Sequence, residues 1–123
     1  MKLAANIFTG IVMLEHVYIL VLEMFLWNTP IGMKAFGFTQ EYADMTKVLA
    51  ANQGLYNGFL AAGLLWGFLT KDMEQRYSIK LFFVSCVAVA AIDGGYSANI
   101  SILFKQGVPA FIALALLLIS GRK

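Results

Sequence analysis

The chain has 123 residues, of which 60% are hydrophobic and 13% are charged, and its mean hydropathy is +0.76. Soluble chains are typically about 25% charged and about 45–50% apolar, so this composition excludes an ordinary soluble domain and favours a lipid bilayer as the surroundings. The net charge of +2 is small, and no basic patch with interleaved aromatic residues points to nucleic acid.

The first apolar stretch covers residues 3–27 and is predicted to be a retained membrane span. It is longer than the apolar core of a signal peptide, and no small-residue cleavage site follows it. Three ionisable residues interrupt it, namely Glu15, His16 and Glu23. On a helical wheel His16 and Glu23 lie about 20° apart, and Glu15 lies about 80° from Glu23. His16 and Glu23 therefore share one face of this helix, and Glu15 lies at the side of that face.

The segment 28–46 is expected to be the longest connection, because it contains Pro30, Gly32 and Gly37. Thr39 followed by Gln40 and an acidic residue is typical of a helix start, so the second helix is expected to begin near Gln40. We expect this loop to cover the mouth of a polar hollow with its aromatic residues, Phe36, Phe38 and Tyr42.

The second span is predicted at residues 47–69 and has two distinct faces. Four polar residues fall within an arc of about 140°, namely Asn52, Gln53, Tyr56 and Asn57. Beside this arc lie small residues at a spacing of four, which lets two membrane helices approach closely: Ala50, Gly54, Gly58 and Ala62.

The third and fourth spans are predicted at residues 77–99 and 106–121, joined by a tight connection at residues 100–105. The third contains Asp93, beside a glycine pair that indicates close packing or a kink, and Cys86, which we interpret as a packing residue. The fourth opens with Gln106, and Pro109 suits its first turn because proline lacks the N–H that is unsatisfied there.

The predicted fold class is all-α, a four-helix transmembrane bundle formed by a single domain of residues 1–123. Continuously apolar runs favour helices over the alternating strands of a membrane barrel. One side of the bundle would hold six basic residues, Lys2, Lys71, Arg76, Lys80, Arg122 and Lys123. The other would hold three, Lys34, Lys47 and Lys105. The positive-inside rule then places both termini in the cytoplasm.

With this orientation the polar residues of all four spans converge in the outer half of the bundle, and the inner half is almost entirely apolar. We therefore predict a polar, acidic cavity open to the extracytoplasmic side, with its floor near Glu15 and His16. Carboxyl groups at this depth are protonated, hydrated, bound to a cation or paired with His16. The alternative is that the amide and carboxyl groups only join helices to each other.

Three strings carry a resemblance to a known family: LEHVYILVLEMFLW at residues 14–27, KVLAANQGLYNGFLAAGLLWG at 47–67 and FKQGVPA at 104–110. They resemble the bacterial membrane proteins grouped as domain of unknown function 1304. The resemblance implies a four-helix protein of the inner membrane and implies no activity. The family's motif residues map onto Glu15, His16, Glu23, Asn52, Gln53, Asn57 and Gln106. Asp93 departs from the family pattern, which weakens any role assigned to it through the family.

Three functions remain open at this point. The first is binding or transport of a small ligand, a cation or a proton, with a homodimer formed through the Gly54–Gly58 face unless that face packs internally. The second is a membrane enzyme acting on a quinone-like or isoprenoid-like substrate, with His16 and a glutamate as acid and base. The third is a structural or accessory subunit. The sequence identifies no cofactor, and a single histidine argues against a haem or di-metal site.

Overall fold

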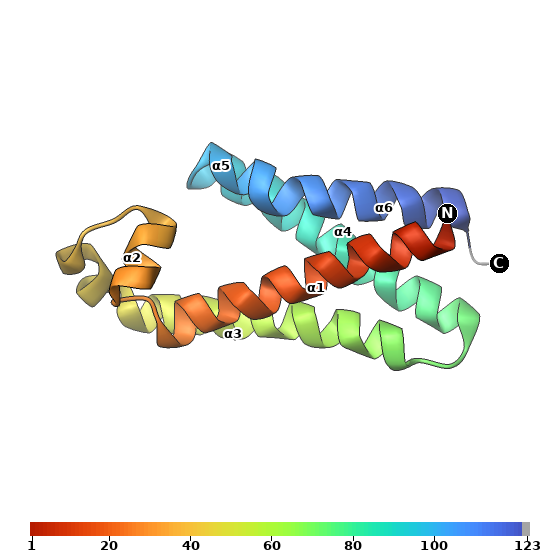
Figure 1. Ribbon diagram of the computed structural model, residues 1–123, viewed down its shortest axis with the longest axis horizontal. Coiled ribbons are helices and arrows are strands. Elements are labelled where there is room, and N and C mark those ends of the chain that lie inside the picture. The colour runs from red at the N-terminus through yellow and green to blue at the C-terminus, as the bar shows by residue number, and fades with distance from the viewer. Residues whose placement is uncertain (122–123) are drawn as a thin grey trace. The chain divides into compact units, whose positions relative to one another are not determined.

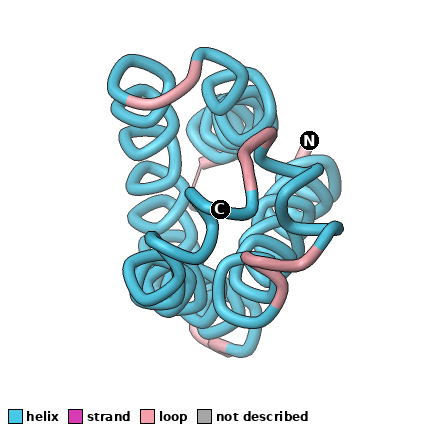
Figure 2. Tube along the Cα trace, turned by 90° about the vertical axis from the view of Figure 1, so that its left-hand side faces the viewer, coloured by secondary structure: helices cyan, strands magenta, loops and turns pink. Residues whose placement is uncertain are grey.

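The computed structural model describes residues 1–121 and is helical throughout that range, with short connections and no strand (Figure 1, Figure 2). Three long helices are α1 (Lys2–Phe25), α3 (Gln40–Leu69) and α4 (Met73–Ser97). The short helix α2 (Pro30–Phe36) lies between the first two, and α5 (Ile100–Ile102), the π-helix η1 (Leu103–Gly107) and α6 (Val108–Ser120) follow α4. The expected all-α class is confirmed.

Three helical segments are long and apolar enough to cross a membrane: Lys2–Phe25, Met73–Ser97 and Ile100–Ser120. Large apolar side chains are exposed along them, for example Leu14 at 63% and Phe82 at 62%. Exposure of this kind suits contact with lipid and not with water. Helix α3 is not among the three, because its amides lower its hydropathy.

The helices fall into two compact units that share α1 and α3, one made of Met1–Glu15 with Leu60–Lys123 and the other of His16–Phe59. In the first unit a core of small and branched residues joins α1, α3, α4 and α6: Ala5, Val12, Leu64, Val84, Val87, Ala88, Ala110, Ala113 and Leu117. Helices α4 and α6 lie side by side (Figure 1). Gly63 of α3 faces the ring of Phe83 of α4 with no room for a Cβ, so the second half of α3 packs directly along α4.

The last helical segment begins earlier than residue 106, because the expected connection at residues 100–105 is helical. Asn99 accepts a hydrogen bond from Ser101 N at 2.9 Å and starts the helix at Ile100. Pro109 lies in the first turn of α6, as expected. Because proline has no N–H, it cannot donate the regular α-helical hydrogen bond to the preceding turn, and this preceding turn is the wider π turn. A Cβ on Gly95 would lie 2.7 Å from Leu103 Cβ, so the glycine pair serves close packing.

Two further features differ from the sequence expectations. The segment 28–46 contains α2, whose first turn is capped by Thr29 Oγ1, 3.4 Å from Gly32 N, and whose last turn ends at Gly37 with φ 74°. A charged residue is buried in the first unit, where the sequence did not predict one: Lys80 of α4 is only 3% exposed. Arg122 and Lys123, which contributed to the predicted orientation, lie outside the described residues.

Candidate functional site

The unit formed by His16–Phe59 holds a buried carboxyl group at the contact between α1 and α3. Glu23 of α1 is 7% exposed. Its Oε1 accepts a hydrogen bond of 3.2 Å from Asn57 Nδ2 of α3, and Asn57 Nδ2 also lies 3.3 Å from Gln53 O. The second carboxyl oxygen, Oε2, is buried and has no hydrogen-bond partner among the described residues.

Small residues of α3 bring the two helices close enough for this contact. A Cβ on Gly54 would lie 3.0 Å from Glu23 Cβ and 3.2 Å from Met24 N, and Gly58 faces Leu20 in the same way. Ala50 is also buried, at 2% exposed. The glycine face of α3 therefore packs internally against α1.

The predicted small-residue stripe does not extend to Ala62, which is exposed, whereas Ala61 is 5% exposed. The reason is geometric, because each step of four residues advances about 400°, and three steps rotate the stripe by about 120° around the helix. The buried position on this side of α3 therefore shifts by one residue, from Ala62 to Ala61.

Aromatic rings pack on each other next to this site, where α1 ends and α3 begins. The ring of Trp27 lies 4.9 Å from Phe36 and 4.5 Å from Phe38, and Phe38 lies 5.2 Å from Tyr42. Trp27 Nε1 donates a hydrogen bond of 3.0 Å to Thr46 Oγ1, which fixes the end of α1 to α3. Thr46 was not identified from the sequence, where it resembles any threonine at a helix end.

The other predicted site residues of this unit are placed differently. His16 is 1% exposed and belongs to the interior. The side chains of Asn52, Gln53 and Tyr56 are exposed, and the Tyr56 ring contacts Phe59 at 6.0 Å. The structure thus joins one amide of the predicted polar face, Asn57, to the acidic face of α1.

Three predicted site residues belong to the other unit. Glu15 is half-buried, and its Oε2 is buried without a hydrogen-bond partner among residues 1–121. Asp93 is exposed and Gln106 is half-buried. Within the described part of the chain, no three His, Cys, Asp or Glu side chains are arranged to hold a metal ion.

The fold places the chain among all-helical proteins whose long apolar helices are compatible with a membrane. The chain belongs to the family described as "Protein of unknown function (DUF1304)", whose model matches residues 10–118. It is also similar to the uncharacterized protein YpaA of Lactococcus lactis subsp. lactis (strain IL1403), at 28% identity over 116 residues, which is 93% of this chain and 96% of that protein. No solved structure matches the chain significantly. The family resemblance noted in the sequence is confirmed.

Proposed function

We propose that the chain crosses the inner membrane of a bacterium four times, with both termini in the cytoplasm. Three spans are the apolar helices, and the fourth is the part of α3 at residues 47–69. This part packs along α4 through Gly63 and Gly67, so the two helices occupy the same depth. At 30 residues, α3 is about 45 Å long against a hydrocarbon layer of about 30 Å, and its charged first turns extend beyond the membrane.

The function that this site supports best is the binding of a small cation, a protonated amine or a proton in the outer half of the membrane. One observation carries the proposal: Glu23 is buried between α1 and α3, with one oxygen held by Asn57 and the other without a partner among the described residues. A buried carboxyl oxygen without a partner is costly, so the site favours a ligand that supplies positive charge or a hydrogen-bond donor. Asn57 holds the carboxyl in place without neutralising it.

The alternative of interhelical attachment makes a different prediction for the same residue. Glutamine in place of Glu23 keeps the oxygen that accepts from Asn57, so a merely structural role survives the substitution. A binding role does not survive it, because the amide has no negative charge and replaces the unpartnered oxygen with a donor. Glu23→Gln therefore separates the two roles at one position.

The test measures the melting temperature of the protein in dodecyl maltoside against sodium chloride, methylammonium chloride and pH. We expect at least one of these probes to raise the melting temperature of the wild type in a saturable way, and Glu23→Gln to abolish that rise. Glu41→Gln is the matched control, because Glu41 is an exposed acid in the first turn of α3, the helix that packs against Glu23. A rise that persists in Glu23→Gln, or no rise with any probe, contradicts the proposal.

A homodimer remains part of the proposal, since four helices are few for a lone transport pathway. Its contact surface cannot be the Gly54–Gly58 face, because α1 covers that face. The exposed amides of α3 are the alternative, and polar groups at membrane depth seek polar partners. Gln53→Cys in a Cys86→Ala background is expected to form a disulfide-linked dimer under oxidation, and a chain that stays monomeric in membranes contradicts this part.

A further inference from the structure

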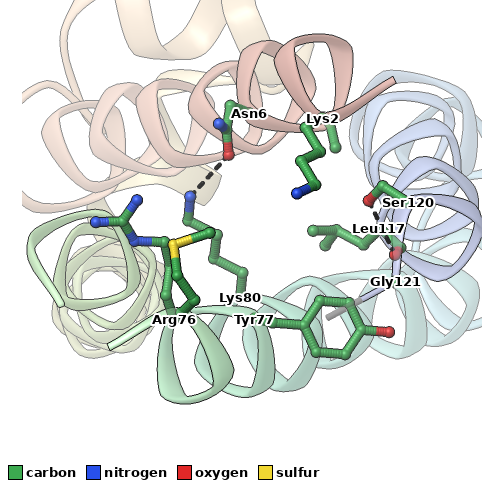
Figure 3. A pocket seen from close by; sticks show the side chains of 10 residues that line it. Lys2, Asn6, Arg76, Tyr77, Lys80, Leu117, Ser120 and Gly121 are labelled. Atoms are coloured by element: carbon green, nitrogen blue, oxygen red, sulfur yellow. Dashed lines mark hydrogen bonds between the residues drawn. The ribbon is translucent and has the colours of Figure 1, made fainter. Parts of the chain in front are cut away.

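A hollow at the end of the unit that contains both termini is lined by residues of α1, α4 and α6 (Figure 3). Its volume is about 70 Å³, which is room for several water molecules. The lining residues are Lys2, Ala5, Asn6, Met73, Arg76, Tyr77, Lys80, Leu117, Ser120 and Gly121. Two helices, α1 and α4, begin here, and α6 ends here.

The lining is strongly cationic. Among residues 1–121 the lining contains Lys2, Arg76 and Lys80 and no carboxylate side chain. The Lys2 ammonium is directed into the space between the helices, and the Arg76 side chain lies at its edge, where Nε donates to Thr70 O at 2.8 Å (Figure 3). Three positive charges around one hollow repel each other, and a bound anion would offset this repulsion.

Lys80 makes the strongest case for an anion. It is 3% exposed and lies in a helix apolar enough to cross a membrane. Its Nζ donates to Asn6 Oδ1 at 2.9 Å and lies 3.7 Å from the centre of the Phe68 ring. An amide oxygen and an aromatic ring stabilise an ammonium group less than a full negative charge does, and burial of a charge is costly without such a partner.

We propose that this hollow is a phosphate-binding site, with Lys2 and Lys80 as its charged ligands. Lysine binds phosphate as a point charge, and the Asn6 amide and the Ser120 hydroxyl supply further hydrogen-bonding groups around the hollow. The positive end of α1, whose first turn contains no acidic residue, adds to the attraction. In the proposed orientation the site lies on the cytoplasmic side, where the phosphate comes from an anionic lipid headgroup or from a free phosphate. Basic pockets between membrane helices bind lipid headgroups in this way.

The test uses purified full-length protein in dodecyl maltoside with three probes: dihexanoyl phosphatidylglycerol, inorganic phosphate and dihexanoyl phosphatidylcholine. We expect phosphatidylglycerol or inorganic phosphate to raise the melting temperature in a saturable way, and more than an equal concentration of chloride. Saturation with phosphatidylglycerol alone identifies a lipid headgroup, and equal saturation with inorganic phosphate identifies a free phosphate. Phosphatidylcholine is neutral and is expected to bind more weakly.

Variants decide whether the hollow itself is the site. Lys2→Gln and Lys80→Gln are each expected to weaken phosphate binding by about tenfold or more, because each removes one charge-assisted contact. Lys71→Gln is the matched control, since Lys71 is an exposed lysine at the same end that does not line the hollow. If Lys80→Gln changes the melting temperature without ligand but leaves the phosphate-induced rise intact, Lys80 is only structural and the proposal is overturned.

Two further results overturn the proposal. One is that neither phosphate probe stabilises the wild type beyond chloride, and the other is that Lys71→Gln weakens binding as much as Lys2→Gln. Because the residues and probes differ from those of the Glu23 test, either proposal can fail while the other stands.

Discussion

Replacement of Gly54 by alanine tests whether the close approach of α1 and α3 holds the Glu23 site together. A Cβ at this position would lie 2.7 Å from Met24 Cγ, 3.0 Å from Glu23 Cβ and 3.2 Å from Met24 N. The first contact ends on a flexible side chain that can move. The other two involve the start of a side chain and the backbone, so the helices must separate by several tenths of an ångström.

The expected cost follows from three effects. Overpacking of this kind costs about 1–3 kcal/mol. Separation of the helices also weakens the bond between Asn57 and Glu23, which is 3.2 Å long and worth about 0.6 kcal/mol for a typical membrane hydrogen bond. Alanine recovers about 0.5–1 kcal/mol of helix propensity relative to glycine. We expect Gly54→Ala to lower the free energy of unfolding by about 1–2 kcal/mol on balance.

The assay is unfolding by sodium dodecyl sulfate in mixed micelles, followed by circular dichroism. Gly10→Ala is the matched control, because Gly10 also lies within a helix, where its Cβ would meet Phe68 Cζ at an ordinary 3.9 Å. That variant is expected to be as stable as the wild type or more so. If both variants unfold at the same fraction of sodium dodecyl sulfate, the tight helix contact described for Gly54 is wrong.

Three further substitutions are expected to lower stability in the same assay. Asp72→Ala removes the oxygen that accepts from Gln75 N at 2.8 Å and caps α4, and should cost about 1 kcal/mol. Gly37→Ala places a side chain at φ 74° and should cost about 1–2 kcal/mol, whereas an unchanged midpoint would mean that α2 does not end in this conformation. Trp27→Phe keeps a ring in the aromatic cluster but loses the 3.0 Å hydrogen bond to Thr46, and should lower the free energy of unfolding by about 1 kcal/mol. No loss would show that the bond is not formed in the membrane.

The long helices could be predicted from the sequence because uninterrupted apolar runs leave few alternatives in a bilayer. The short helix α2 was missed because proline and glycine at its ends resemble loop residues when the Thr29 cap is not considered. The start of the last helix was missed because Asn99 and Pro109 lie on either side of a π turn, and a proline near an expected helix start hides the helix before it.

The candidate site was predictable in part. The sequence could place Glu23 and Asn57 in the same half of the bundle, because consecutive antiparallel helices bring the end of one beside the first half of the next. The exposure of Asn52 and Gln53 was not predictable, because a polar arc of about 140° does not say which edge faces the neighbouring helix. The burial of Lys80 was missed because a lysine near a helix end usually extends its ammonium group to water.

The π turn at Leu103–Gly107 lets one helix present two faces that regular winding would keep apart. An inserted residue rotates the preceding side chains by about 100° relative to those that follow. Ile102 and Leu103 can therefore contact the glycine pair of α4 while Ala110 and Ala113 enter the core. Deletion of a single residue within this turn would restore ordinary winding and turn Ile102 away from Gly94, so this short stretch should be intolerant of any change in length.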